Sequence, residues 1–295
     1  MESILSDESS FTHRGENLTD LHPIVPFWYA PIQLILNIIN HWYLLSNMVK
    51  RNLNQRYNKA LLGYVWTLLE PALLAAVYYI LFIIIADYED KNYPMLILLG
   101  VIGWSMYAKI LNATVATLYN NSGMIKQSGF PLEIYPASDC LTNLAISSIS
   151  VFTVIPFMIY LGIQPAATLW MLPVALIMLL FTALGIGMMF ASANIVFPDI
   201  THAFRFITRA GFFVSPIMWT YEILISRVGV NSPYLEIVML NPVVVPLTMM
   251  RHAIQGTIPE FETYHVVYAA LFPIVSYLIG SIIYSKSARG VVKRL

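Results

Sequence analysis

The chain has 295 residues, of which 58% are hydrophobic and only 11% are charged, and its formal net charge is zero. A soluble domain carries about a quarter charged residues, so this composition excludes an ordinary soluble domain. Zero net charge offers no bulk attraction to nucleic acid. A single cysteine, Cys140, excludes both an intrachain disulfide framework and a cysteine metal site.

The N-terminal residues 1–30 are polar, and we expect them to be mobile. They lack a basic start followed by an apolar stretch, so we expect no cleavable signal peptide and assign targeting to the first spanning helix. Residues 31–56 place apolar side chains at helical spacing, with polar side chains largely on other faces. This segment is predicted to be one amphipathic helix lying in the membrane interface.

Between residues 65 and 284 the chain carries repeated apolar blocks of roughly 20 residues, the length that a helix needs to cross a bilayer. Backbone groups find no water there, so only helices or closed barrels span, and blocks of this length favour helices. The predicted fold is an all-α integral membrane domain (65–284) with six transmembrane helices. The predicted spans are 65–86, 94–119, 140–163, 169–196, 204–225 and 265–284.

Two longer segments connect these spans. The first, 120–139, contains several glycines and prolines. The second, 226–262, is apolar but is broken by Pro233, Pro242, Pro246 and Pro259, so it is too interrupted for one straight span. We predict that it forms two short re-entrant helices that dip into the outer leaflet.

The basic residues sort strongly to one side of the predicted spans. That side receives Lys50, Arg51, Arg56, Lys59, Lys126, Arg205, Arg209 and, in a basic tail (285–295), Lys286, Arg289, Lys293 and Arg294. The other side receives Lys91, Arg227 and Arg251 together with Asp87, Glu89, Asp90, Glu222, Glu236, Glu260 and Glu262. The positive-inside rule then predicts that both termini are cytoplasmic.

Glu70 and Lys109 are the only ionisable residues well inside the first two predicted spans. A charge in a membrane normally faces protein or water. Glu70 precedes Pro71 near the cytoplasmic start of its span, which favours a water-exposed carboxylate. Lys109 either lines a pathway or extends its long stem toward the interface, and a direct pair between the two residues stays open.

Sequence motifs of the common enzyme classes are absent. The chain contains no GxxxxGK[ST] phosphate loop, no HExxH motif and no nucleophile elbow, and its histidines are scattered. We therefore predict no catalytic residue, no bound metal and no enzyme activity. A transporter of this kind needs energy from elsewhere, delivered through its cytoplasmic connections.

Aromatic residues in the spans have two interpretations. Tryptophan and tyrosine near span ends usually form an interfacial belt, whereas rings facing a pore would suit the C–H surfaces of sugars. The candidate pore-lining rings are Tyr78, Trp104, Tyr107, Phe190 and Trp219. Ala183, Gly187 and Ala191, at four-residue spacing, favour close helix packing within the subunit.

Several short motifs, in order, resemble the permease subunits of polysaccharide-exporting ABC transporters, which carry O-antigen, capsule or teichoic acid. The first is the entry to span one, formed by Arg56, Tyr57, Leu62, Gly63, Trp66, Leu69 and Pro71. The second is the loop with Asn120, Ile125, Lys126, Phe130, Pro131, Glu133 and Pro136. Further matches are Ser215, Pro216, Asn241, Pro242 and Arg251. The chain departs from the family at Pro198, which stands before Asp199 in place of the usual arginine.

The resemblance implies a homodimer in the cytoplasmic membrane, each copy bound to a separate ATPase subunit that holds ATP and magnesium. The loop after span two would couple to that ATPase through Gly123, Met124, Ile125, Lys126, Gln127, Phe130, Pro131 and Glu133. The substrate would be a lipid-linked polysaccharide, whose anionic headgroup would arrive at Arg51, Arg56, Tyr57 and Lys59. The segment 226–262 would form an outer gate.

Three alternatives stay open. A drug or small-lipid exporter of the same fold would have a lateral hydrophobic pocket in place of a continuous pore. A membrane-bound transferase acting on polyprenyl sugars would need clustered acids or histidines. A scaffold without transport activity would leave the coupling loop without a purpose.

Overall fold

The computed structural model describes residues 29–57, 61–86, 92–127, 130–230 and 232–292, and these residues contain helices and no strand. The predicted mobile segment falls almost wholly outside this range. The α-helices are α1 (Ala30–Asn40), α2 (Trp42–Tyr57), α3 (Val65–Ala86), α4 (Tyr93–Asn120), α5 (Ser122–Gln127), α6 (Ile134–Val151), α7 (Val154–Leu161), α8 (Met171–Ala191), α9 (Ala193–Val196), α10 (Asp199–Val214), α11 (Tyr221–Val228), α12 (Pro233–Met239), α13 (Val244–Gln255) and α14 (Thr263–Val292). One short 3₁₀ helix, η2 (Ala167–Trp170), precedes α8.

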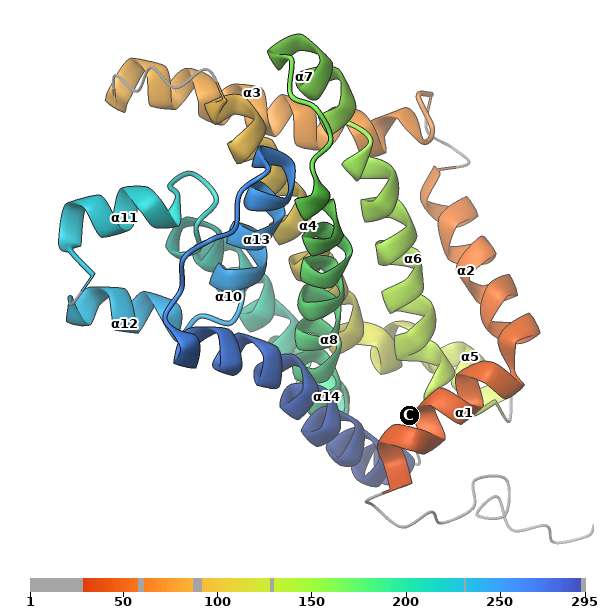
Figure 1. Ribbon diagram of the computed structural model, residues 1–295. Coiled ribbons are helices and arrows are strands. Elements are labelled where there is room, and N and C mark those ends of the chain that lie inside the picture. The colour runs from red at the N-terminus through yellow and green to blue at the C-terminus, as the bar shows by residue number, and fades with distance from the viewer. Residues whose placement is uncertain (1–28, 58–60, 87–91, 128–129, 231, 293–295) are drawn as a thin grey trace, which may run out of the picture.

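Helices α4 and α8 form the centre of the molecule, with α14 and α6 packed around them and α3 lying across one end (Figure 1). Glycines let α8 approach two neighbours. A Cβ added at Gly187 would lie 2.6 Å from Thr114 of α4, and one added at Gly185 would lie 2.3 Å from the Ser276 backbone of α14. Ala183 and Ala191 are fully buried. The small residues of α8 therefore pack within the subunit, as their spacing predicts.

Within the described residues, four helical segments are long and apolar enough to cross a membrane: Tyr93–Asn120, Ile134–Leu161, Ala167–Ala191 and Thr263–Ala288. A fifth is obtained if α12 and α13, which are bent by 88° at their junction, form one span. These segments match four of the six predicted spans. The fold is therefore confirmed as all-helical with four or five candidate spans, while the count of six stays a prediction.

The predicted span 204–225 is wrong beyond Val214. Helix α10 ends there, Ser215 is extended (φ −84°, ψ 154°), and α11 begins only after Thr220. Pro216 explains the break, because a proline disfavours helical backbone in the residue before it. The Thr220 hydroxyl then accepts the Ile223 amide at 3.3 Å and starts α11, a short helix outside the candidate spans.

The predicted single helix 31–56 is divided into α1 and α2 at His41. The two helices pack on different elements, α1 against α14 and α2 against α6 (Figure 1). On α14, the Tyr277 hydroxyl donates to the Pro31 carbonyl at 3.2 Å, and the Tyr284 hydroxyl donates to the Leu132 carbonyl at 2.8 Å. The division at His41 coincides with the change of packing partner from α14 to α6. The position of both helices in the membrane interface stays a prediction.

Helix α14 runs on to Val292, so the first part of the predicted basic tail 285–295 continues the last long helix. The segment 226–262 contains the two short helices α12 and α13, as predicted, together with the end of α11. Their insertion into the outer leaflet stays a prediction.

Candidate functional site

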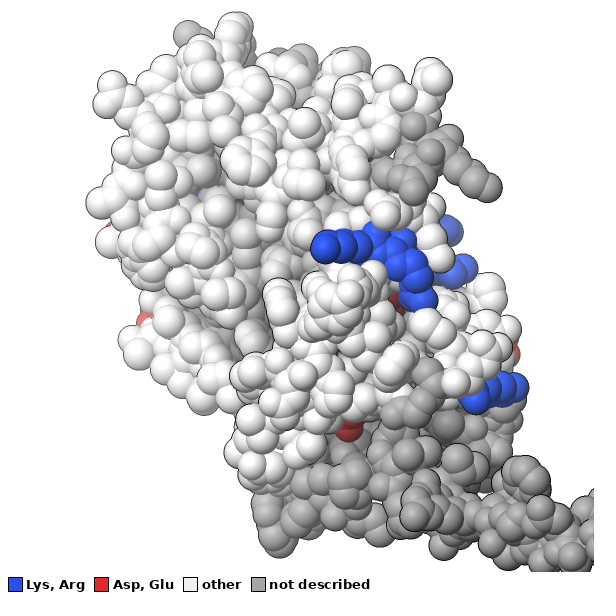
Figure 2. Space-filling view, turned by 90° about the vertical axis from the view of Figure 1, so that its right-hand side faces the viewer, with Lys and Arg blue, Asp and Glu red and all other residues white. Residues whose placement is uncertain are grey.

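A polar pocket of about 500 Å³ opens between α2, α4, α6 and α10. Its walls carry Asn52, Gln55 and Arg56 from α2, Ala108, Lys109, Asn112 and Ala113 from α4, Asp139, Thr142 and Asn143 from α6, and Arg205 from α10. On the face that carries α2, basic side chains gather in a band, and uncharged side chains cover the surface above it (Figure 2). This polar cavity therefore lies beside the basic side of the molecule.

The lining of this pocket is cationic. Its described lining includes three cations, Arg56, Lys109 and Arg205, and one carboxylate, Asp139. Arg56 donates from Nη1 to Oδ1 of Asn143 at 3.2 Å. Cations supplied by three separate helices, with amides between them, suit a phosphate or another oxyanion.

Asparagines within the apolar helices find local partners. Asn112 donates from Nδ2 to the Ala108 carbonyl at 2.7 Å and to the Thr208 hydroxyl at 3.1 Å, which ties α4 to α10. Asn143 donates to the Asp139 carbonyl at 2.8 Å. The buried Oδ1 of Asn112 has no hydrogen-bond partner among the described residues. The pocket wall is thus fixed in place and keeps one free acceptor.

The structure separates the residues that the sequence assigns to the headgroup. Arg56 lines the pocket, whereas the Arg51 guanidinium lies 2.9 Å from the Met124 sulfur of α5 and 3.1 Å from Oδ1 of Asn52. The Tyr57 side chain and Lys59 lie outside the described side chains. Arg51 therefore contacts the predicted coupling segment.

Two further pocket cations, Lys109 and Arg205, are absent from the predicted headgroup set. The direct pair left open by the sequence is present, because Nζ of Lys109 lies 3.1 Å from Oε2 of Glu70 on α3. The sequence signals the importance of Lys109, which stands as a lone charge in an apolar span. No spacing rule brings it to Arg56 or Arg205.

The predicted coupling segment has an outer and an inner side. Gly123, Lys126, Gln127 and Phe130 are exposed, Met124 and Pro131 are half-buried, and Ile125 and Glu133 are buried. Oε2 of Glu133 accepts from Nδ2 of Asn37 at 3.3 Å, which fixes the segment to α1. The exposed residues are available to a partner, and the role of the whole set in coupling stays a prediction.

Three of the predicted channel aromatics meet α10. The Tyr78 ring lies 5.2 Å from Phe212 and the Phe190 ring lies 4.9 Å from Phe204, measured between centroids. Trp104 packs on Gly211, where an added Cβ would lie 2.7 Å from the indole.

Trp104 and its neighbour Tyr107 are buried inside the subunit, with ring centroids 5.4 Å apart. Trp219 lies in the break after α10 and donates from Nε1 to the Phe213 carbonyl at 3.4 Å. The assignment of these rings to a channel wall stays a prediction.

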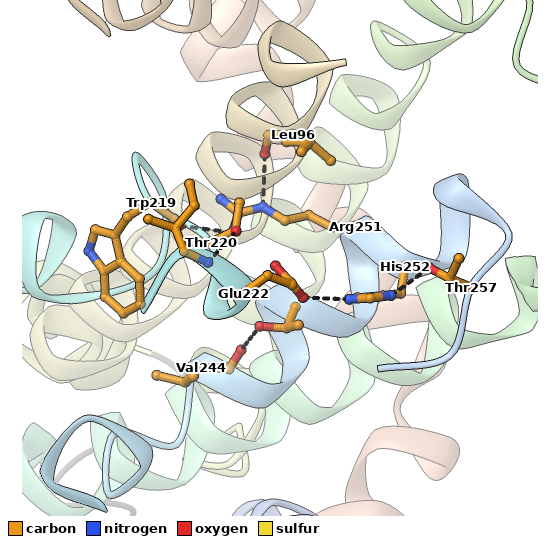
Figure 3. A network of polar contacts seen from close by, with 10 residues as sticks. Leu96, Trp219, Thr220, Glu222, Val244, Arg251, His252 and Thr257 are labelled. Carbon is orange, nitrogen blue, oxygen red and sulfur yellow. Dashed lines mark hydrogen bonds and ion pairs between the residues drawn. The ribbon is translucent and has the colours of Figure 1, made fainter. Parts of the chain in front are cut away.

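A second polar network fastens the break after α10 (Figure 3). The Arg251 side chain, 2% exposed, donates to the backbone carbonyls of Leu96, Ile217 and Trp219 at 3.0, 2.8 and 3.0 Å. Arg251 thereby joins α13, α4 and the residues that follow α10.

Beside Arg251, the next residue holds α11 (Figure 3). Nε2 of His252 lies 2.9 Å from Oε1 of Glu222, and Nδ1 lies 2.6 Å from the Thr257 hydroxyl. Burial would raise the pKa of Glu222. Hydrogen bonds from His252, its own backbone amide and Thr220, with the charge of His252, instead lower this pKa to about 2. Glu222 is therefore held as a carboxylate.

The sequence model of ABC-2 type transporters matches residues 43–255, a range that contains every residue of the pocket. The chain belongs to the ABC-2 type transporter family. Family membership makes the protein a membrane component of a transporter and not a catalytic enzyme.

Three relatives are similar over most of their length. The O-antigen export system permease protein RfbA of Myxococcus xanthus is 25% identical over 221 residues, which cover 74% of this chain and 82% of the relative. The protein of the same name from Klebsiella pneumoniae is 22% identical, with 82% and 91% covered. The polysialic acid transport protein KpsM of Escherichia coli is 24% identical, with 79% and 89% covered.

Proposed function

We propose that this ABC-2 family member is the membrane subunit through which a transporter exports a lipid-linked polysaccharide across the cytoplasmic membrane. One observation carries this proposal: relatives named for O-antigen export and for polysialic acid transport align with 74–82% of the chain and with 82–91% of their own length. Such relatives favour a glycan cargo over a drug or a small lipid.

The proposed membrane topology has six spans, formed by α3, α4, α6 with α7, η2 with α8, α10, and α14. Both termini are cytoplasmic, and α12 and α13 re-enter the outer leaflet as a gate. The distribution of basic residues supports this orientation, because the pocket cations and α5 then share the cytoplasmic side. The acidic residues around α11 lie outside.

The working unit is proposed to be a homodimer with two copies of a separate ATPase. Helices α3 and α10 are the proposed walls of the shared channel, because both expose apolar side chains that no described residue covers. These side chains are Leu73, Val77, Ile80 and Leu81 on α3, and Phe206, Ile207, Phe213 and Val214 on α10. A second copy related by a two-fold axis would cover them.

Energy is proposed to enter through α5 and the residues that follow it. The exposed side chains of Lys126, Gln127 and Phe130 would contact the ATPase, which binds ATP and magnesium. Nucleotide binding can shift the membrane subunits only if it favours one of their conformations. The attachment of this segment to α1 and α2 supplies a route into the membrane subunit.

The polar pocket is proposed to receive the phosphate or pyrophosphate that joins glycan to lipid. Arg56, Lys109 and Arg205 supply the positive charge, and Asn52, Gln55 and Asn143 supply neutral donors. The glycan would then follow the channel through many weak contacts with aromatic rings.

The experiment is transport into inside-out vesicles that contain the protein and its ATPase. The probe is radiolabelled lipid-linked glycan extracted from the cells that make this protein. We expect ATP-dependent appearance of the glycan in the vesicle lumen, protected from added glycosidase. Transport of the free lipid carrier at the same rate, or no protection in the presence of ATP, would contradict the proposal.

A further inference from the structure

Lys109 belongs to two neighbouring sites. Its ammonium lies 3.1 Å from Oε2 of Glu70, in a small recess that also includes Pro71 of α3. The same side chain lines the polar pocket beside Arg56 and Arg205. One cation therefore lies between a carboxylate on α3 and a cavity suited to an anion.

We propose that Lys109 exchanges partners: Glu70 holds it until a phosphate or pyrophosphate group binds in the pocket, and the bound anion then takes the ammonium and breaks the ion pair between α3 and α4. The inference rests on the proposed function, because it requires the pocket to bind an anion. Beyond the proposed function, it states how the subunit would change its structure when the cargo binds.

The relative strength of the two partners favours the exchange. The Glu70 side chain is 52% exposed and that of Lys109 is 27% exposed, so water weakens their pair. A phosphate carries more charge and accepts several charge-assisted hydrogen bonds at once. The phosphate is also attracted by Arg56 and Arg205 in the pocket. The Glu70 carboxylate forms its ion pair with Lys109 and with neither of these arginines.

The pocket also offers Lys109 a second acceptor. Asn112 lies three residues further along α4, so the two side chains share a face of the helix. Its buried Oδ1 has no partner among the described residues, whereas its amide nitrogen is fully used. Because this oxygen is covered in the present conformation, an ammonium with three donors can bind it together with the anion only after the Asn112 side chain shifts.

The consequence falls on the start of α3. Pro71 removes the amide that would bond the Thr67 carbonyl, and the Ser150 hydroxyl of α6 replaces it at 2.8 Å. A second hydroxyl, that of Thr153, donates to the Leu68 carbonyl at 3.4 Å, so loss of the Glu70 pair would leave this end of α3 attached by hydrogen bonds to α6 and Thr153, without its bond to α4. Because α3 is the proposed wall of the dimer channel, headgroup binding would loosen the helix that has to move.

The first test measures binding to the complete complex in lipid nanodiscs. The probes are a short polyprenyl pyrophosphate, inorganic pyrophosphate and the matching polyprenol. We expect the dissociation constant of Lys109→Met for the pyrophosphate lipid to rise about ten- to hundredfold, as for a lost charge-assisted bond. We expect that of Glu70→Gln to fall about two- to fivefold, because a competing carboxylate is gone.

The opposite changes in dissociation constant expected for the two variants distinguish an exchange of partners from a purely structural ion pair. A structural pair, broken from either side, would weaken binding in both variants or in neither. Glu260→Gln, a distant exposed carboxylate, and Arg209→Gln, one turn beyond Arg205, are the matched controls and should bind as the wild type does. If polyprenol bound as tightly as the pyrophosphate lipid, the affinity would come from the lipid chain and the inference would fail. If inorganic pyrophosphate bound as tightly as the pyrophosphate lipid, the affinity would come from the phosphates alone, as the inference allows.

The second test follows hydrogen exchange of the amides of residues 65–70. We expect the pyrophosphate lipid to speed exchange in the wild type, exchange to be fast without ligand in Glu70→Gln, and ligand to have no effect in Lys109→Met. If the dissociation constants of both variants changed in the same direction, or if ligand did not affect hydrogen exchange in the wild type, the exchange of partners would be overturned while the proposed function would stand. A wild type that binds no phosphorylated probe would overturn the pocket assignment as well.

Discussion

The Arg51 guanidinium of α2 lies 2.9 Å from the Met124 sulfur of α5, and one turn further along α2 Gln55 and Arg56 line the polar pocket. A single helix thus contacts the predicted coupling segment at one point and the predicted cargo site at another. We therefore expect a movement of α5 to reach the pocket wall through α2, which contacts both.

Replacement of Arg51 by methionine tests this connection. We expect the stimulation of ATPase activity by lipid-linked glycan to fall about two- to tenfold, the value of one or two ordinary hydrogen bonds. Assembly of the complex should be unchanged. Lys50→Met, at the exposed neighbouring position, is the control and should keep full stimulation. Normal stimulation in the Arg51 variant would remove α2 from the coupling route.

Loss of Arg251 should weaken the attachment of α13 to α4 and to the break after α10. Its replacement by methionine removes three hydrogen bonds to the carbonyls of Leu96, Ile217 and Trp219, and we expect a loss of at least about 2 kcal/mol of stability. Denaturation in detergent, followed by circular dichroism, measures this loss. Arg251→Lys should recover part of it, because lysine lacks the planar fork. Arg227→Gln, exposed on α11, should have no effect.

The crossing of α8 and α14 predicts intolerance of side chains at Gly185. A Cβ there would lie 2.3 Å from the Ser276 backbone, so Gly185→Ala should destabilise the protein by about 1–3 kcal/mol. Gly290 is the control. It lies near the end of α14, where an added Cβ would have no atom within 4 Å, so Gly290→Ala should be neutral or slightly stabilising. Equal melting temperatures for the two variants would show that the close approach is not required.

Acidification should release α11 from α13. The folded-state pKa of Glu222 is lowered from 4.5 to about 2, so its pairing contributes stability above pH 4.5, and this contribution is lost as the pH falls from 4.5 toward 2. We expect faster hydrogen exchange of α11 amides across this window. Glu222→Gln should show fast exchange at every pH. If the exchange rate of α11 amides in the wild type, corrected for the intrinsic rate, did not change between pH 4.5 and 2, the stabilising role of Glu222 would be contradicted.

The long helices could be predicted from the sequence because each apolar block is continuous and is ended by a proline, a glycine or a cluster of charges. Helix α4 follows this pattern, with Pro94 at its start and Gly123 just beyond its end. The break at Ser215 was missed because the apolar residues continue across it, although Pro216 carries the local signal. The division of α1 from α2 carries a weaker signal, since it depends on packing against helices distant in sequence.

The pocket could be predicted only in part. Arg56 was found through a motif, and Lys109 through the cost of a charge inside a span. Their convergence with Arg205 depends on the packing of four helices, which no local spacing encodes. The contact of Arg51 with α5 could not be predicted for the same reason, since one turn of α2 separates it from Arg56, which lines the cavity.

The two tyrosine bonds of α14 set an order of assembly for the newly made chain. Tyr277 is bonded to Pro31, 246 positions earlier, and Tyr284 to Leu132, 152 positions earlier. The cytoplasmic surface around α1 and α5 is therefore completed only after the ribosome has released the last helix. If the proposed ATPase docks beside α1 and Leu132, we expect it to bind only chains in which α14 is already in place.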